Sequence, residues 1–494
     1  MPLPPPLGDI EQPKDGSCEN CRTHPARKQF YENLRELAKE ITSQELTEIL
    51  GSTIKKDDVT KINVFLDMVL TYTERDQQNA GLIAASSTGK SYIPLELAPY
   101  FPDRDVIKLG YASPTAFFHE WGLWIRDPRL PPLCDGYEES EDEEEKKKRQ
   151  QKENLTVIDL HQKILIFLDS PHSELLKNLR SLLSHDDKYI EQRITDRSQK
   201  SGMRTRKILL IGYPTVLFCS ANTVLDEQEK TRLNLYSPES SQEKLREAIA
   251  YKIHKDGDRN LFEKQIADDP KRTLLQIRIA DIKRMDFRNI TISEELQAEI
   301  NQKFIEMHQT LQARHQRDIG RLLAKIKAFA ILNYHSRKHD TNGNLEVNRE
   351  DVINGFAQYE TYRESNEIGL PPEFYNAFLD MKEDFLNPGL TIDEYQKEYF
   401  KNFKILLGRD KARAYLKAYT TVGLLYEVPD ATDKRKVRYM CGEVGTSITE
   451  EGEKGLEEGQ KRLITPPTPN HLYLQKSAIE ENPEDHPEPG SNHE

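Results

Sequence analysis

Residues 84 to 91 constrain the fold of this chain more than any other segment. They read Ala-Ala-Ser-Ser-Thr-Gly-Lys-Ser, follow the apolar run Gly81-Leu82-Ile83 and precede a helix-like segment at 92–97. A strand, a tight loop ending in Gly-Lys-Ser and a helix form the layout of a phosphate-binding loop, whose backbone N–H groups face the phosphates. The alternative is a Ser-rich turn that caps a helix.

This loop predicts ATP and Mg²⁺ as cofactors. We expect Lys90 to reach the β- and γ-phosphates and the Ser91 hydroxyl to ligate Mg²⁺. The usual motif opens with glycine, and here the small residue Ala84 takes that position. The expected phosphate-binding residues are Ala85, Ser86, Ser87, Thr88, Gly89, Lys90 and Ser91.

The magnesium ion requires a carboxylate on a nearby strand. The apolar run from Lys163 ends in Asp169, as expected for a central strand whose carboxyl end faces the phosphates. We therefore expect Asp169 to hold Mg²⁺ together with Ser91, although it can instead cap the helix that follows. The next residue is Ser170 and not the glutamate that would activate water, so Glu174 is a weak candidate base and slow hydrolysis is left open.

Three further residues are candidates for contact with the γ-phosphate. Asn222 follows the apolar run 216–219 and is expected to orient the attacking water, with Ser220 as second choice and a plain turn residue as the alternative. Arg232 precedes the apolar segment Leu233-Asn234-Leu235, and Arg317 opens a helical segment. A guanidinium can stabilise the charge of a transferring phosphoryl group, but each arginine is equally consistent with an ordinary surface position.

Alternating strand and helix patterns over residues 80–240 predict an α/β fold with a mostly parallel sheet covered on both faces. Charged residues at 135–153 predict a solvated insertion loop, and apolar spacing predicts helices at 30–50, 59–72, 241–335 and 348–382. The expected strands are 81–84, 106–109, 164–168, 207–211 and 215–219. The expected domains are a disordered N-terminus (1–24), a helical cap (25–75), an ATPase core (76–240), a helical lid and connector (241–385), a small C-terminal domain (395–441) and a disordered acidic tail (442–494).

The charge and the cysteine content limit the classes of function that are possible for this chain. The net charge is −13, of which the tail 443–494 carries −8 and the segment 135–153 carries −4, so the remaining chain is nearly neutral and can carry local basic patches. No apolar run has the length of a membrane span and no secretory signal opens the chain, so we expect a soluble cytoplasmic protein with no membrane partner. Cys18, Cys21 and His24 form at most part of a zinc site.

The order of these motifs resembles that of AAA+ ATPases, and more narrowly of the minichromosome maintenance (MCM) helicases and related mobile-element helicases. The resemblance covers roughly residues 75–335. It implies a Walker A motif at 84–91, a Walker B motif at 164–169, sensor 1 at Asn222, an arginine finger at Arg232 and sensor 2 at Arg317. It also implies a homo-oligomeric ring with ATP bound between subunits, and a β-hairpin before sensor 1 that grips DNA. Within residues 182–210, the hairpin's candidate DNA contacts are Lys188, Arg204 and Arg206.

A second DNA-binding candidate lies near the C-terminus. Residues 403–425 predict a basic helix with an apolar stripe, and a short turn then leads to a basic strand pair ending near Tyr439. A helix followed by a basic β-wing resembles a winged helix-turn-helix, in which the helix enters a DNA groove and the wing touches phosphates. The alternative is a winged helix that binds protein. The candidate DNA contacts are Arg409, Lys411, Arg413, Lys434, Arg435 and Lys436.

Three functions remain open from the sequence. The leading hypothesis is an ATP-dependent, helicase-like translocase that works as an oligomer on DNA. The second is a nucleotide-gated DNA-binding switch or loader with little or no hydrolysis, which Ser170 favours. The third and weakest is a P-loop kinase, which the paired arginines and the long helical lid disfavour.

Overall fold

The computed structural model describes residues 37–110, 112–113, 122–127, 130, 142–169, 173–183, 189–196, 204–220 and 232–441, apart from residues 286, 288, 309, 342, 387 and 434. The predictions of disorder for residues 1–24 and 442–494 lie outside this part of the chain.

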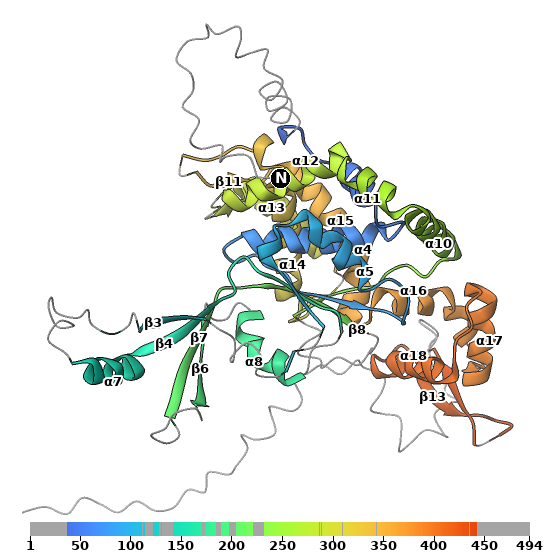
Figure 1. Ribbon diagram of the computed structural model, residues 1–494. Coiled ribbons are helices and arrows are strands. Elements are labelled where there is room, and N and C mark those ends of the chain that lie inside the picture. The colour runs from blue at the N-terminus through green and yellow to red at the C-terminus, as the bar shows by residue number, and fades with distance from the viewer. Residues whose placement is uncertain are drawn as a thin grey trace, which may run out of the picture.

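A five-stranded parallel sheet forms the centre of the molecule (Figure 1). Its strand order is β2-β5-β8-β1-β9, and every neighbouring pair is parallel. The predicted α/β fold with a central parallel sheet is thus confirmed. Because the strands run the same way, their carboxyl ends share one edge, called here the carboxyl edge. The strands are β1 (Ala80–Ile83), β2 (Val106–Leu109), β5 (Ile164–Phe167), β8 (Thr215–Ser220) and β9 (Asn234–Tyr236).

Both faces of this sheet are buried, which explains the unbroken apolar runs of its strands. In β5, Ile164 and Ile166 point into the helical side of the core, whereas Leu165 and Phe167 point to the other side. Burying one such side chain stabilises the fold by about 1.5–3 kcal/mol. The helical side is covered chiefly by α4, α12, α14 and α15, and the other side by α8 (Ser173–Leu183) and the base of a second sheet.

The N-terminal cap is described only from Leu37 onward. Within these residues the helix expected at 30–50 is mainly α3, which begins at Ser43 because Thr42 and Glu45 form a reciprocal capping box. The helix expected at 59–72 is confirmed as α4 followed by a 3₁₀ turn. The elements up to β2 are α3 (Ser43–Leu50), α4 (Asp58–Val69), η2 (Leu70–Tyr72), α5 (Tyr92–Leu97), η3 (Ala98–Tyr100) and η4 (Asp103–Asp105).

The predicted lid is helical, but two short parallel strands, β10 (Ile290–Thr291) and β11 (Leu345–Glu346), interrupt it. A fully buried ion pair between Lys325 Nζ and Asp67 Oδ1 at 2.6 Å ties the lid to the cap, and the Tyr236 hydroxyl of β9 joins both groups. The helices are α10 (Gln242–Gly257), α11 (Arg259–Ala267), α12 (Pro270–Arg284), α13 (Glu294–Glu306), α14 (His315–Leu332), η6 (Tyr334–Ser336) and α15 (Arg349–Ile368).

A second, four-stranded sheet of order β3-β4-β7-β6 extends from the core (Figure 1). The predicted strand 207–211 belongs to this sheet and not to the parallel one, because it pairs antiparallel with β6 and parallel with β4. The charged insertion is also not all loop, since Asp142 caps a helix, α7, whose first turn is acidic. The elements are β3 (Leu123–Arg126), α7 (Glu143–Glu153), β4 (Asn154–Asp159), β6 (Tyr189–Asp196) and β7 (Arg204–Ile211).

The C-terminal unit has its own core and starts earlier than predicted, because α16 packs into it through stacked rings of Phe374 and Tyr415, 3.9 Å apart. Its three antiparallel strands have the order β12-β14-β13. The predicted helix and strand pair are both present. The elements are α16 (Pro372–Asp380), η7 (Lys382–Phe385), β12 (Leu390–Thr391), α17 (Ile392–Phe403), α18 (Arg409–Thr421), β13 (Tyr426–Pro429) and β14 (Val437–Met440).

Candidate nucleotide site

The loop 84–91 lies at the carboxyl edge between β1 and α5, as predicted. The backbone at Ser87 and Gly89 has positive φ values of 67° and 95°, which turns the chain sharply. Thr88 Oγ1 donates to the carbonyl of Ala85 at 2.8 Å, and Lys90 Nζ donates to the same oxygen at 3.3 Å. The Lys90 ammonium therefore folds back over its own loop.

The alternative interpretation of this segment, a turn that caps a helix, has little support. Ser91 is the N-cap of α5 but makes no side-chain capping hydrogen bond. The helix itself spans only Tyr92–Leu97, so its dipole is small. Any attraction for an anion must come mainly from Lys90 and from the amides of the loop.

Asp169 is brought to the same edge as Lys90. The register pairs Ile83 of β1 with Ser220 of β8, and Phe167 of β5 with Phe218 of β8, so the loop and Asp169 are about two strand spacings (~10 Å) apart. The pKa of the buried Cys219 thiol is affected by the charges of both Lys90 and Asp169. Burial raises its pKa to about 12, while the Lys90 charge lowers this pKa and the Asp169 charge raises it. The positive charge of Lys90 and the negative charge of Asp169 therefore both affect the pKa of this thiol.

Lys244 is a site residue that the sequence analysis missed. It lies in the first turn of α10, where its Nζ donates to the carbonyl of Thr88 at 3.0 Å and pairs with Asp57 Oδ2 at 2.6 Å. Burial raises the pKa of Asp57, and the charge of Lys244 opposes that rise. A second ammonium group is therefore held against the loop. The sequence signal was its place in the first helical turn after the last strand of the sheet.

Glu373 of α16 approaches the same loop from the C-terminal unit. Its Oε1 accepts a hydrogen bond from the Tyr415 hydroxyl at 3.3 Å, and its Oε2 is buried without a hydrogen-bond partner among the described residues. Burial raises the pKa of Glu373, whereas Tyr415, the Ala85 amide and the charges of Lys411 and Lys244 lower it. A carboxylate from far along the sequence thus lies beside the Ala85 amide of the loop.

The candidates for water activation are only partly described. Asn222 and Ser170 lie outside the described residues. Ser220 is buried at the end of β8, where its carbonyl accepts from the Ala84 amide at 3.2 Å. Glu174 is exposed in the first turn of α8. The residue that would activate water therefore stays a prediction.

The two predicted arginines lie away from this loop, toward the opposite edge of the sheet. Arg232 directly precedes the amino end of β9, where Asn234 pairs with Ala80 at the start of β1. Arg321 of α14 donates to the Leu233 carbonyl at 2.9 Å, and Arg317 lies one turn earlier on that helix. Within one chain, the loop that contains Lys90 and the two predicted arginines therefore lie at different edges of the sheet.

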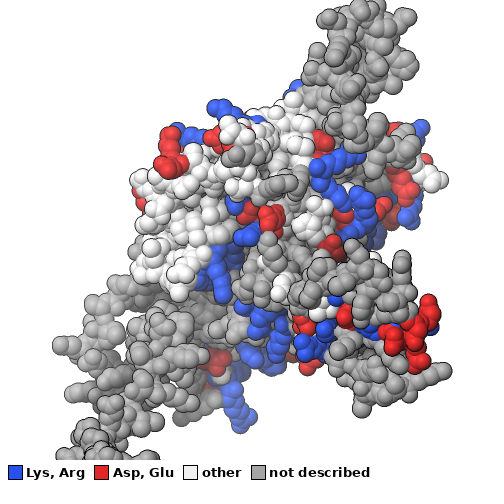
Figure 2. Space-filling view, turned by 90° about the vertical axis from the view of Figure 1, so that its left-hand side faces the viewer, with Lys and Arg blue, Asp and Glu red and all other residues white. Residues whose placement is uncertain are grey.

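The hairpin expected to contact DNA is present as β6 and β7, paired over their full length. Arg206 lies partly buried and its Nε donates to Thr156 Oγ1 of β4 at 3.0 Å, so this side chain supports the sheet. Lys188 and the side chain of Arg204 lie outside the described part of the chain. Figure 2 views the molecule from the side on which this sheet lies and shows Lys and Arg side chains across the middle of that face.

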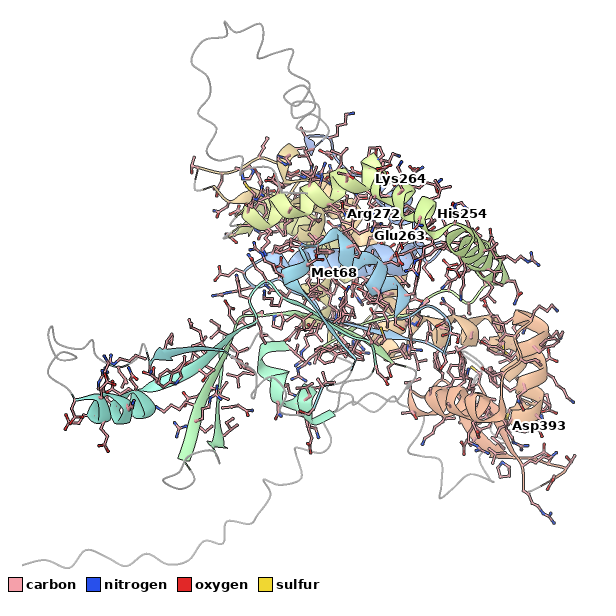
Figure 3. The ribbon with its side chains drawn as sticks, in the orientation of Figure 1. Met68, His254, Glu263, Lys264, Arg272 and Asp393 are labelled. Atoms are coloured by element: carbon pink, nitrogen blue, oxygen red, sulfur yellow. The ribbon has the colours of Figure 1, made fainter. Side chains whose placement is uncertain are left out.

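The basic helix α18 has the two faces that its sequence predicts. Ala412, Tyr415, Leu416 and Tyr419 are buried, whereas Arg409, Lys411 and Arg413 are exposed. Arg409 lies 3.5 Å from Asp393 of α17, a residue labelled in Figure 3. Arg435 and Lys436 are exposed in the turn between β13 and β14, and Lys434 is not among the described residues.

A cavity of about 260 Å³ opens beyond α5, between that helix and the helices α10 to α12. Its charged groups are already engaged. Lys255 lies 3.5 Å from Glu96, Arg259 lies 2.9 Å from Glu263, and Arg272 lies over the Tyr100 ring (Figure 3). Two ion pairs thus cancel four of the five charges that line this cavity, and the remaining cation, Arg272, is packed against Tyr100.

Within the described residues, every helix is too short or too polar to cross a lipid bilayer. Comparison with models of protein families gives no match, and neither does a search of curated proteins.

Proposed function

We propose that this chain is an ATPase that works as an oligomer on DNA, in the manner of the AAA+ helicases that its motifs resemble. One observation carries the proposal: the strand register places the loop that contains Lys90 and the end of β5 that leads to Asp169 at the same edge of the sheet, about two strand spacings (~10 Å) apart. In this proposal ATP lies on the loop 85–91, with Lys90 against the β- and γ-phosphates. Mg²⁺ is held by Ser91 and Asp169 and would neutralise charge that develops on the phosphates.

The separation of lysine and arginine supports an oligomer. Arg232 and Arg317 lie toward the edge opposite the loop, and the sheet separates them from phosphates bound by the same chain. In a head-to-tail assembly, the arginines of one copy would instead face the loop of the next copy. Such a contact repeats around a ring when its rotation closes. Guanidinium groups supplied in this way stabilise the transferring phosphoryl group.

The connection between β7 and β8 would transmit movement from the nucleotide site to the hairpin that would hold DNA. Only residues 212–214 separate the hairpin strand β7 from β8, whose end lies beside the loop. Gly212 has φ 86°, and a Cβ there would meet the backbone nitrogen of His161 at 2.5 Å, so this corner is tightly packed. A displacement of β8 on hydrolysis would therefore move the hairpin and, with it, the DNA that its basic residues would hold. The exposed basic face of α18 would provide a second DNA contact.

A second candidate function is a nucleotide-gated DNA-binding switch, and the position of Glu373 favours it. Its carboxylate lies beside the Ala85 amide and competes with a phosphate for the same loop. Since Glu373 and the basic helix α18 share one structural unit, nucleotide would release or reposition that unit when it displaces the carboxylate. The absence of a glutamate at position 170 also suits a protein that hydrolyses slowly.

The steady-state ATPase rate, with and without single- and double-stranded DNA, tests the proposal. We expect hydrolysis that DNA stimulates, and a loss on the order of 100-fold in Lys90→Ala, because a preorganised donor to the phosphates is removed. Lys108→Ala, which removes an exposed lysine of β2, is the matched control. ATP binding and hydrolysis at the normal rate in Lys90→Ala would refute the site. Tight ATP binding with slow turnover that is indifferent to DNA would favour the switch.

A further inference from the structure

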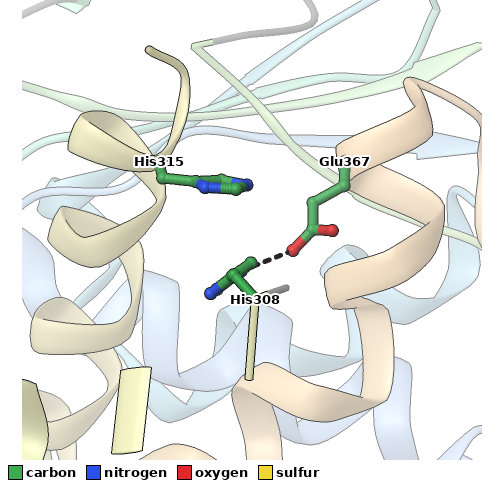
Figure 4. A group of neighbouring side chains, drawn as sticks. All are labelled: His308, His315 and Glu367. Carbon is green, nitrogen blue, oxygen red and sulfur yellow. Dashed lines mark hydrogen bonds and ion pairs between the residues drawn. The ribbon is translucent and has the colours of Figure 1, made fainter. Parts of the chain in front are cut away.

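Three potential metal ligands meet at the ends of three helices (Figure 4). His308 follows α13, His315 opens α14, and Glu367 lies in the last turn of α15. Their nitrogen and carboxylate oxygen atoms all lie within 4.8 Å of one another, and both histidines are buried. None of these residues takes part in the nucleotide site.

The hydrogen bonds of His308 leave one ring nitrogen facing an acceptor. Its Nδ1 lies 2.7 Å from the Phe304 carbonyl, which only accepts, so this nitrogen carries the proton. Its Nε2 lies 2.9 Å from Glu367 Oε1, which also accepts when ionised. Two acceptors at that distance require either a proton, carried by Nε2 or by the carboxyl group, or a metal ion. A backbone carbonyl on Nδ1 is also the partner that commonly orients a metal-bound histidine.

His315 completes the cluster. Its ring lies 4.1 Å from the His308 ring, centroid to centroid, and its Nδ1 accepts from the Gln312 amide at 3.1 Å. Binding through Nδ1 requires the Gln312 amide to move, and binding through Nε2 requires the proton to change nitrogen.

We propose that His308, His315 and Glu367 form a binding site for a divalent transition metal of the zinc class. Two imidazoles and one carboxylate are a ligand set that zinc accepts, with a fourth position left for water. Donors bonded at about 2.0–2.1 Å in a tetrahedron lie about 3.3 Å apart. The 2.9 Å between His308 Nε2 and Glu367 Oε1 would therefore widen slightly, and the other separations, which are at most 4.8 Å, would shrink to that value. Arg363 lies 3.3 Å from Glu367 Oε1 and balances the carboxylate before metal binds.

The metal would join the ends of three helices close to an arginine of the proposed catalytic site. Arg314 donates to the backbone carbonyl of Glu367, and Arg317 lies only two residues after His315. The metal would therefore fix the amino end of α14, which carries one of the arginines proposed to act on a neighbouring copy. Its contribution is positional, since the cluster lies outside the nucleotide site.

Zinc binding to the full chain tests this site. The reference variant carries Cys18→Ser, Cys21→Ser and His24→Gln, which removes the other candidate zinc ligands. A chelator strips its metal, and all measurements are made without nucleotide or Mg²⁺. Competition with a chromogenic chelator counts bound Zn²⁺, and the visible spectrum of the Co²⁺ form reports the geometry. We expect one zinc per reference chain, at least a 100-fold weaker affinity in His315→Gln and in Glu367→Gln, and a rise in Tm with zinc only in the reference.

His254→Gln, which alters an exposed histidine of α10, is the matched control and should keep full zinc affinity. Unchanged Tm of the metal-free ligand variants would show that they remain folded. No zinc in the reference chain, or equal affinity in the reference and both ligand variants, would overturn the proposal and leave a proton as the cation at His308.

Discussion

At the carboxyl edge of the central sheet, Lys90, Asp169 and Lys244 converge from three separate parts of the chain. At the opposite edge, Arg232 and Arg317 lie near the start of β9. In the proposed function, the first edge has the groups that would bind a nucleotide and its metal, whereas the second has the groups that would stabilise a transition state. One copy would then provide half of each proposed catalytic site, so the two edges should respond differently to substitution.

The largest effect is expected at the arginine edge. Arg232→Ala should lower the ATPase rate by about 10³-fold, because an arginine supplied to the phosphoryl group contributes on this scale. The affinity of the single chain for ATP should stay unchanged, since Arg232 lies away from its own loop. Equilibrium ATP binding and single-turnover hydrolysis measure the two quantities separately. A loss of ATP binding equal to that of Lys90→Ala would remove the distinction between the edges.

The buried pair between Lys325 and Asp67 should be the most sensitive structural link between the lid and the cap. Lys325→Met leaves Asp67 buried without its cation and should lower the free energy of unfolding by about 3–5 kcal/mol, as measured by urea denaturation. The double variant Asp67→Leu/Lys325→Met should recover most of this loss, because it buries no unpaired charge. A single variant as stable as the wild type would show that the pair does not hold the lid.

Glu373→Gln should raise the affinity for ATP about 5- to 10-fold at pH 8, because one repulsive charge near the phosphates contributes on the order of 1 kcal/mol. Burial raises the pKa of Glu373 in the folded chain, so the folded state binds this proton more tightly than the unfolded state. The stability that this proton contributes to the folded chain is present below pH 4.5 and is lost as the pH rises through the folded pKa of Glu373. The protection factors of the loop amides, which correct for the intrinsic pH dependence of hydrogen exchange, should follow that trend in the wild type and show no such trend in Glu373→Gln.

The smallest effect is expected at the basic face of α18. Arg413→Ala should weaken binding to DNA of any sequence and reduce the slope of log K against log salt by about 1, because one phosphate contact is lost. Lys397→Ala, which removes an exposed lysine of α17, should leave the slope unchanged. Fluorescence anisotropy at several salt concentrations measures both. Equal slopes for all three proteins would assign this unit to protein binding.

Sequence patterns predicted the parts of the fold whose signals are local. The strand Ile164–Phe167 and the loop after Ile83 are readable because a buried parallel strand is apolar throughout and a tight loop needs small residues. The strand Lys207–Ile211 looks alike in composition, yet it pairs with β4 and β6, since partners are chosen by contacts distant in sequence.

The sequence likewise predicted only those residues of the candidate site that belong to local motifs. Lys90, Ser91 and Asp169 follow from motifs, and the structure places the loop and Asp169 at one edge. Lys244 and Glu373 reach that loop through tertiary packing, and the only local signal is the place of Lys244 in the first turn of the helix after the last strand of the sheet. The helix α7 was missed because its block of charges was interpreted as solvated loop, although Arg149 and Glu153 lie 3.6 Å apart along it.

Mixing two inactive variants tests the central claim most directly. Lys90→Ala lacks a working loop and Arg232→Ala lacks the arginine, but a neighbouring pair of the two variants contains one complete site in which Lys90 and Arg232 are both present. We predict that each variant alone is inactive and that an equimolar mixture recovers a substantial fraction of the wild-type ATPase rate. A mixture no more active than its components, under conditions where they assemble together, would contradict the account.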